Sequence, residues 1–204
     1  MSASPDARSA PQKLARDERV MSSSATADVT RTPSAGREGL TIHRRYTERG
    51  ADPFASVRWE RRASRIRDEA GKTIFEMENV KVPADWSQVA SDIMASKYFR
   101  KAGVPELDAA DQPLHDPQGN IVLGPEWSAR QVMRRLTNCW RWWGERYNYF
   151  RSTEDADAFE AELQYMLVHQ MVAPNSPQWF NTGLHRSYGI TGPAQGHYYV
   201  DPQT

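Results

Sequence analysis

The chain has 204 residues, and its 26 lysines and arginines balance its 26 aspartates and glutamates, so its formal net charge is zero. A chain of this length can bury one ordinary hydrophobic core, and the charge balance gives no general electrostatic reason to bind nucleic acid. The single cysteine, Cys139, excludes an internal disulfide and any metal site built from four cysteines. No apolar run reaches the roughly 20 residues of a membrane-spanning helix, and the N-terminus lacks the apolar stretch of a secretory signal. We therefore expect a cytoplasmic protein with no membrane contact.

Residues 1–36 are rich in Ser, Ala, Thr, Pro and Arg and contain almost no large apolar side chains. Such a segment cannot bury enough surface to offset its chain entropy, which predicts a disordered tail. An arginine-rich tail also suits a targeting or nucleic-acid-binding arm, but the scattered Asp and Glu residues favour a solvated extension. We therefore place the folded region at residues 37–204.

The segment Arg37–Arg67 contains nine arginines against four acidic residues. With Tyr46, Phe54 and Trp59 interleaved, it could contact nucleic acid or a nucleotide phosphate. Part of the segment alternates as a strand does, and one solvated face is the simpler interpretation.

A β-hairpin is predicted next. Residues 57–67 and 72–77 carry alternating or β-favouring side chains on both sides of the glycine-bearing turn Asp68–Gly71. Pro83 is expected to stop the second strand. Asp85 and Gln88 then resemble an N-cap and its N3 partner, which predicts a helix ending near Gly103 with four side chains inward: Trp86, Val89, Ile93 and Met94.

Two further helices follow a loop. Residues 103–125 hold four prolines and three glycines, which indicates a loop with a short strand at Asn120–Leu123. Ser128 and Gln131 form a capping-box pair for the next helix, which is expected to fray near Gly144. Its predicted buried face consists of Val132, Leu136, Trp140 and Trp143. A third helix is expected to start near Ser152 or Thr153 and to break at Pro174. Three acidic residues lie in or near its first turn, where they favour a helix: Glu154, Asp155 and Asp157. Its predicted buried face consists of Phe159, Leu163, Met166 and Leu167.

The stretch Ala173–Gly183 reads Ala-Pro-Asn-Ser-Pro-Gln-Trp-Phe-Asn-Thr-Gly. Its two prolines bracket Asn175 and Ser176 and prevent the preceding helix from continuing. Hydroxyl, amide and backbone N–H groups in such a turn can bind phosphate oxygens. The alternative is a proline-rich corner whose polar groups satisfy one another.

Other candidate chemistry is weaker. His185, His197 and Asp201 lie in a glycine-rich loop, but their spacing matches no metal-binding pattern, so no metal site is predicted. Cys139 lies in an aromatic helix and is expected to be a packing residue. His169, near the end of the third helix, can interact favourably with the helix dipole, and nothing independent supports a catalytic role. The sequence has no P-loop and no dinucleotide-binding glycine pattern.

Several separate blocks, in order, resemble the beginning of class II ribonucleotide reductases, the adenosylcobalamin-dependent enzymes. The resemblance covers about residues 44–201 and rests on Arg45-Tyr46-Thr47, Asp52-Pro53-Phe54, Val57–Arg62, Val82–Ser87, Lys97–Arg100, Val168-His169-Gln170, Asn175–Asn181 and Gly196-His197-Tyr198-Tyr199.

The resemblance implies an α+β fold, namely a mainly helical N-terminal region with a β-hairpin that leads into the first elements of a ten-stranded α/β barrel. It implies an oxidoreductase that reduces ribonucleotides to deoxyribonucleotides for DNA synthesis and replication, with the cobalt cofactor adenosylcobalamin generating a thiyl radical. Ser176 would contact the substrate, with Asn175 beside it. The implied partners are a ribonucleotide, the remaining C-terminal part of the reductase and a thiol reductant such as thioredoxin, and a homo-oligomer is left open.

In this family, a redox cysteine follows the Gly-His-Tyr-Tyr loop, whereas this sequence reaches Thr204 without one and Cys139 lies upstream. We therefore expect no catalytic residue in this chain and no activity from it alone, as in a truncated gene product or one part of a split enzyme. Two alternatives stay open, a stand-alone nucleotide-binding module and a structural partner of a separately encoded catalytic chain. Diphosphate or triphosphate substrates, the allosteric effector and the position of the cobalamin site are also open.

Overall fold

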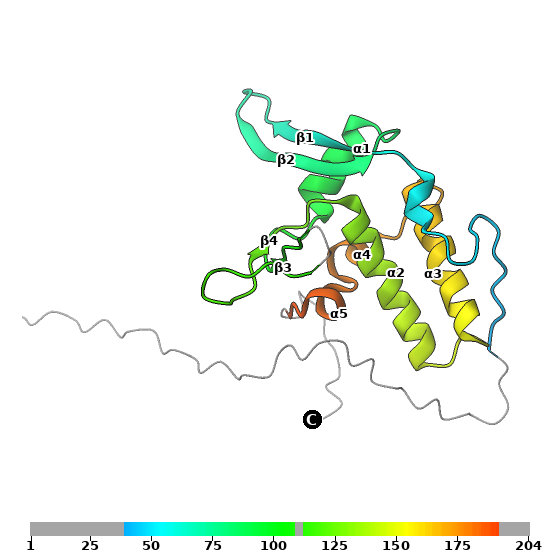
Figure 1. Ribbon diagram of the computed structural model, residues 1–204. Coiled ribbons are helices and arrows are strands. Elements are labelled where there is room, and N and C mark those ends of the chain that lie inside the picture. The colour runs from blue at the N-terminus through cyan, green and yellow to red at the C-terminus, as the bar shows by residue number, and fades with distance from the viewer. Residues whose placement is uncertain (1–38, 109–111, 192–204) are drawn as a thin grey trace, which may run out of the picture. The chain divides into compact units, whose positions relative to one another are not determined.

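The computed structural model describes residues 39–108 and 112–191 (Figure 1). The predicted α+β class is confirmed, with two small antiparallel sheets beside a set of helices. The predicted tail at residues 1–36 lies outside the described residues. In chain order, the elements are η1 (Pro53–Ser56), β1 (Trp59–Arg67), β2 (Thr73–Pro83), α1 (Gln88–Ile93), η2 (Met94–Tyr98), β3 (Val104–Pro105), β4 (Leu123–Gly124), α2 (Ala129–Arg146), α3 (Thr153–Val168), α4 (Ser176–Asn181) and α5 (Leu184–Tyr188).

The predicted hairpin is confirmed as β1 and β2, which pair antiparallel from Trp59 opposite Pro83 to Arg67 opposite Thr73. The turn between them uses Gly71, whose φ of +79° is readily adopted only by glycine. The register shifts between Arg62 and Ser64, where Asn79 of β2 adopts a φ of +60°. This bulge bends the longer strand, and the base of the hairpin, at Val80 and Val82, is fully buried.

The helix after the hairpin differs from its prediction. Ser87 rather than Asp85 is the N-cap of α1, because its hydroxyl oxygen accepts a hydrogen bond from the Ala90 amide at 3.1 Å. Val89 and Ile93 are exposed, so their predicted burial is wrong, whereas the burial of Trp86 and Met94 is confirmed. The buried face is instead made by side chains three and four positions apart: Ser91, Met94 and Ala95.

The segment η2 continues α1 as a π-helix. The Phe99 amide donates to the Met94 carbonyl at 3.0 Å, five residues back, and η2 ends at Tyr98 rather than near Gly103. The two ends of the following loop pair as the short antiparallel strands β3 and β4, in which Val104 lies opposite Gly124. The predicted strand at Asn120–Leu123 is therefore displaced by a few residues.

Helix α2 has the predicted capping box, in which the Gln131 side chain accepts from the Ser128 amide at 3.0 Å. Val132 and Leu136 are fully buried as predicted, Trp140 is half-buried and Trp143 is exposed. The helix continues two residues past Gly144, to Arg146. A Cβ at residue 144 would lie 2.3 Å from the Phe150 ring. Glycine therefore allows the Phe150 ring to pack directly on the helix backbone.

Helix α3 begins at the predicted cap, with Ser152 accepting from the Asp155 amide at 3.2 Å. It ends at Val168, well before Pro174, and Gln170 then turns the chain with a φ of +55°, so the prediction that Pro174 breaks it is wrong. Of its predicted buried face, only Leu167 is fully buried. The observed face includes three polar side chains, Asp155, Glu162 and Gln164. Backbone amides of the N-terminal segment 39–47 donate to Asp155 and Glu162, and Gln164 donates to the Thr137 hydroxyl of α2.

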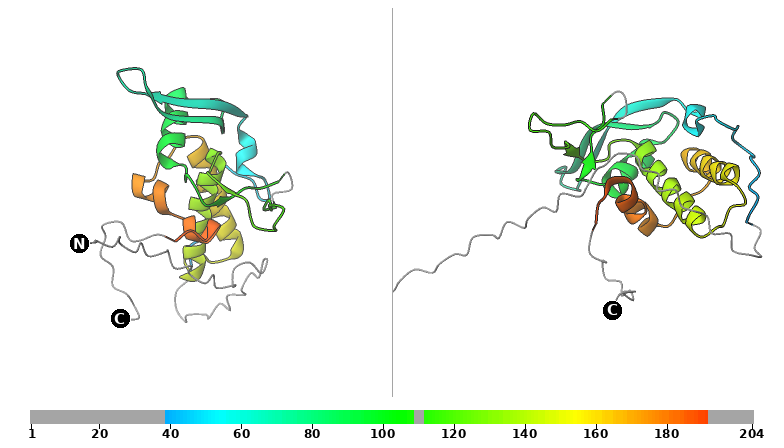
Figure 2. Two further views of the ribbon diagram at one scale, coloured as in Figure 1. Left: turned by 90° about the vertical axis from the view of Figure 1, so that its left-hand side faces the viewer. Right: turned by 60° about the horizontal axis from the view of Figure 1, so that its bottom comes forward.

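The core lies where the base of the hairpin, α1–η2, α2 and the end of α3 meet (Figures 1 and 2). Trp86 connects two of these parts, since its indole N–H donates to the Val168 carbonyl at 2.9 Å. Each of the two sheets in the described residues has two antiparallel strands, and the ten-stranded barrel implied by the family resemblance is not formed by these residues.

Candidate functional site

The stretch Ala173–Gly183 contains a short helix rather than an open turn. The Asn175 side chain caps α4, since its Oδ1 accepts from the Ser176 amide at 2.9 Å, and Pro177 occupies the first helical turn, where no intrahelical N–H is needed. Gly183 follows with a φ of +82° and leads into α5. Pro177 therefore belongs to the new helix, and α3 has already ended at Val168 before the first proline.

The structure brings the two predicted substrate-contacting residues to the beginning of α4. Asn175 is exposed and Ser176 is half-buried. The Ser176 Oγ lies 3.3 Å from the Tyr98 hydroxyl of η2, and either oxygen can donate. Both side chains thus keep access to solvent at the point where α4 meets η2.

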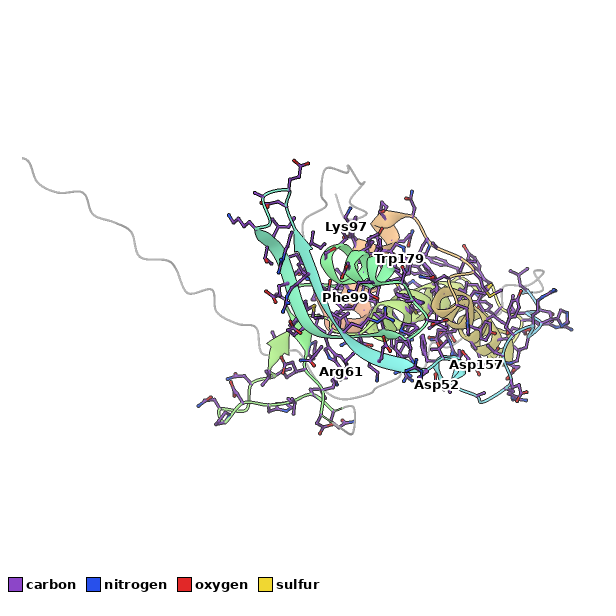
Figure 3. All side chains as sticks on the ribbon, turned by 90° about the horizontal axis from the view of Figure 1, so that it is seen from above. Asp52, Arg61, Lys97, Phe99, Asp157 and Trp179 are labelled. Atoms are coloured by element: carbon purple, nitrogen blue, oxygen red, sulfur yellow. The ribbon has the colours of Figure 1, made fainter. Side chains whose placement is uncertain are left out.

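Aromatic side chains fix this junction. The Trp179 ring is buried and stacks on the Tyr98 ring, with centroids 5.6 Å apart, and the Phe180 ring is tilted against Tyr98 with centroids 5.4 Å apart. Figure 3 labels Trp179 on α4 and Lys97 on η2, the two elements that the Tyr98–Trp179 contact joins. Phe180 is 43% exposed, so of the two aromatic residues only Trp179 is an internal anchor.

A buried guanidinium holds the backbone of the site. Arg135 of α2 is 1% exposed, and its Nη1 donates to the Thr182 carbonyl at 2.8 Å. Its Nη2 donates to the Trp179 carbonyl at 2.7 Å and to the Tyr98 carbonyl at 3.2 Å. One cation therefore joins α2, the end of η2 and the end of α4.

Glu126 balances the charge of Arg135. The two side chains form an ion pair with Nε and Oε1 2.7 Å apart, and Glu126 is fully buried. Its carboxylate also accepts from the Arg100 amide and from the Tyr188 hydroxyl, each at 2.8 Å. Burial, followed by the nearby charge of Glu126, raises the pKa of Tyr188, so the phenol remains a neutral donor to the carboxylate.

Gly183 lets α5 approach this cluster. A Cβ at residue 183 would lie 2.1 Å from the Arg135 carbonyl oxygen, and the positive φ independently disfavours other residues. The backbone here reverses in contact with α2, and Tyr188 of α5 reaches Glu126 as a result.

Cys139 is buried in α2, as predicted, and burial raises the pKa of its thiol. A thiol of this kind is a poor nucleophile, which supports its assignment as a packing residue. His169 caps α3; its Nε2 lies 2.9 Å from the Ser56 hydroxyl and its ring packs on Tyr165.

Three residues were weighed as metal ligands and not predicted to form a site, and the structure describes only one of them. His197 and Asp201 lie outside the described residues, and His185 is exposed on α5. In residues 39–108 and 112–191, no three His, Cys, Asp or Glu side chains gather as a metal-binding group.

The arginine-rich segment is largely paired within the chain. Arg44 and Arg49 bind Glu154, Arg62 binds Glu60, and Arg65 binds both Glu76 and Glu78. Arg61 lies over the Trp127 ring at 4.9 Å. These contacts support the interpretation of the segment as a structural, solvated face.

Comparison with known proteins identifies the family. The sequence model of one protein family, the class II vitamin B12-dependent ribonucleotide reductases, matches residues 60–170 of this chain. The chain belongs to this family.

Three relatives illustrate the match, each a vitamin B12-dependent ribonucleotide reductase. The protein of Bradyrhizobium diazoefficiens is 48% identical over 185 residues, covering 81% of this chain and 14% of the relative. That of Agrobacterium fabrum is 45% identical over 181 residues, with the same two coverages, and that of Rhodopirellula baltica is 36% identical over 157 residues, covering 76% of this chain and 14% of the relative. The chain thus spans about 14% of the length of these curated relatives.

The family depends on vitamin B12. The buried polar cluster around Arg135 makes its hydrogen bonds within the chain, so its donors and acceptors are not open to a cofactor. We therefore assign none of them to the cofactor. Among the described residues, no helix has the length and apolar character needed to cross a membrane.

Sequence reasoning missed the residues that hold the site. Tyr98 was recognised only as part of a family block, and Arg135, Glu126 and Tyr188 were not singled out. The available signal was weak: Arg135 belongs to a helix with many arginines, and its burial depends on partners far away in the sequence.

Proposed function

We propose that this chain forms the N-terminal part of a vitamin B12-dependent ribonucleotide reductase and that Ser176 contacts the ribonucleotide. The complete enzyme would reduce ribonucleotides to deoxyribonucleotides by thiyl-radical chemistry for DNA synthesis. The observation that carries the proposal is the placement of Ser176, an accessible hydroxyl on a backbone anchored by the buried Arg135–Glu126 pair.

The geometry suits ligand contact. Arg135 holds the carbonyls of Trp179, in the same short helix, and of Thr182, its C-cap, so the helix that carries Ser176 is fixed at its other end. A site residue on a rigid element keeps its position when the ligand arrives, so little ordering cost accompanies binding. Asn175 contributes by fixing the first amide of α4.

The proposal gives this chain a binding role rather than a redox role. Cys139 is buried and its thiol pKa is raised, so we assign no catalytic residue among the described residues. In the complete enzyme, the thiyl cysteine, the adenosylcobalamin site, the contact with a dithiol reductant of the thioredoxin kind and the barrel would come from other parts of the reductase.

The test uses the complete reductase that carries this chain as its N-terminal part. Ribonucleotide reduction is measured with adenosylcobalamin and a dithiol for wild type, Ser176→Ala and Asn175→Asp. Ser176→Ala is expected to raise KM about three- to tenfold, the usual result of losing one hydrogen bond to a ligand. Asn175→Asp keeps an N-cap acceptor but adds a negative charge beside the ligand, and it is expected to raise KM further.

Ser187→Ala is the matched control, since Ser187 is an exposed serine on the neighbouring helix α5. Kinetic constants unchanged by both Ser176→Ala and Asn175→Asp would overturn the substrate contact. Calorimetry of the 204-residue chain with ribonucleotides separates the stand-alone alternative: tight binding by this chain alone would favour an independent nucleotide-binding module.

A further inference from the structure

We propose that Tyr98 is a positioning residue for the nucleotide site and that its hydroxyl orients the hydroxyl of Ser176 toward the ligand. This inference rests on the proposed function, because it assumes that Ser176 contacts a ribonucleotide. It adds a second residue, from a different element and 78 positions away in the sequence, to the site.

The first support is the hydrogen bond between the two side chains. Their oxygens are 3.3 Å apart and either can donate. A phenol is a stronger hydrogen-bond donor than an aliphatic alcohol, so the favoured arrangement has Tyr98 donating to the Ser176 Oγ. The serine proton then points away from Tyr98 and is free to be donated to an oxygen atom of the ligand.

The second support is the rigidity of the Tyr98 ring. It stacks on Trp179 with an interplanar angle of 26° and also contacts Phe180. A ring held by these contacts keeps its hydroxyl oxygen next to Ser176. The position of the Tyr98 oxygen beside Ser176 is therefore set before a ligand binds.

The third support is the shared anchor of the two backbones. The Nη2 atom of Arg135 donates both to the Tyr98 carbonyl and to the Trp179 carbonyl. Because Arg135 is buried and paired with Glu126, this link is shielded from water. Arg135 thus sets the distance between η2 and α4, the helix that carries Ser176.

The π-helical turn is consistent with this role. Tyr98 is the last residue of η2, in which the hydrogen bond from Phe99 spans five residues instead of four. Such turns are rare and are frequent at functional sites. Here the turn presents Tyr98 to α4, where its ring and hydroxyl meet Trp179 and Ser176.

The competing explanation is that Tyr98 only packs against Trp179. Tyr98→Phe separates the two, because it keeps the ring and removes the hydroxyl. We would measure kcat and KM for wild type, Tyr98→Phe, Ser176→Ala and the double variant in the complete reductase, together with the unfolding midpoint of each. Tyr165→Phe is the matched control, since Tyr165 lies on α3 and stacks on Tyr46.

Tyr98→Phe is expected to raise KM about three- to fivefold, with kcat within twofold of wild type and an unchanged unfolding midpoint. In the double variant the effect of Tyr98→Phe should vanish, because Tyr98 acts only through Ser176. Two results would overturn the positioning role and leave the proposed function standing. In the first, Ser176→Ala raises KM but Tyr98→Phe leaves KM unchanged. In the second, the KM of the double variant shows the two single effects multiplied together. No effect of Ser176→Ala would instead remove the proposed function, and the role of Tyr98 with it.

Discussion

Two arginine–glutamate clusters in this chain contain the same chemical groups in opposite surroundings. Arg135 and Glu126, beneath the proposed site, have side chains 1% and 0% exposed. Arg65 binds Glu76 and Glu78 near the tip of the β-hairpin, where all three side chains are about half exposed. Removing one partner from a buried pair leaves an uncompensated charge, whereas an exposed pair exchanges its partner for water. The number of ion pairs therefore says little about stability, and their burial says much.

Glu162 of α3 lies between these extremes. Its carboxylate is buried but has no cation as its main partner; it accepts from the Thr47 hydroxyl at 2.6 Å and from the Thr47 amide at 2.9 Å. Burial acts to raise the pKa of Glu162, but the hydrogen bonds from Thr47 and Tyr46 outweigh it and lower the pKa. Here neutral donors, rather than a cation, stabilise the buried charge.

The largest effect is expected from Arg135→Met. This change leaves Glu126 charged and buried, and it removes the donors to the Trp179 and Thr182 carbonyls. We expect a loss of about 3–5 kcal/mol in the free energy of unfolding, measured by urea denaturation with tryptophan fluorescence.

The double variant Arg135→Met with Glu126→Gln serves as the control, and it should recover part of the loss because the buried charge is gone. A loss below about 1 kcal/mol for Arg135→Met alone would mean that the buried pair is no more important than the exposed one.

An intermediate effect is expected from Glu162→Gln. The change weakens the hydrogen-bond acceptor for the N-terminal segment 39–47, and it should lower the free energy of unfolding by about 1–2 kcal/mol at neutral pH. Because the pKa of Glu162 is lowered in the folded state, its contribution is present above the ordinary carboxylate range and is lost as the pH falls below about 4.

Amide hydrogen exchange at Tyr46 and Thr47 measures this directly. In wild type, the protection of these amides should fall on acidification, and in Glu162→Gln it should be lower at pH 7 and nearly independent of pH. Glu48→Gln, which changes an exposed carboxylate of the same segment, should leave both unchanged. Protection in wild type that is the same at pH 3 and pH 7 would disprove the assignment.

The smallest effect is expected from Arg65→Ala. Its ion pairs with Glu76 and Glu78 are exposed, so water and salt replace them when the guanidinium is removed. The urea midpoint should stay within experimental error of wild type at 0.15 M salt. A destabilisation as large as that of Glu162→Gln would show that the hairpin tip is coupled to the core, and the contrast between the clusters would fail.

The elements predicted correctly from sequence are those fixed by neighbours. Ser128 with Gln131, and Ser152 with the first turn of α3, are caps whose partners lie within three residues. The wrong cap, Asp85 instead of Ser87, arose because two residues with acceptor side chains lie two positions apart, and the local sequence pattern fits both.

The remaining errors have other causes. Val89 and Ile93 were placed inward by counting a helical period from Trp86, but Trp86 precedes the N-cap Ser87 and so lies outside the helix. Asn175 and Ser176 could be selected from sequence as unusual polar residues between prolines. Arg135, which holds the backbone beneath them, could not be selected in the same way. It reaches a carbonyl 47 residues away, and no local pattern distinguishes it from the exposed arginines of the same helix.

The π-turn at η2 also makes the length of this segment a constraint. Successive residues of an α-helix are rotated by about 100° around its axis, and a π-turn accommodates one residue more than an α-turn. Deleting a single residue between Met94 and Tyr98 would restore an ordinary helix and rotate the aromatic ring by about a quarter of a circle. A one-residue deletion would therefore separate the ring from α4 even if every remaining side chain were kept.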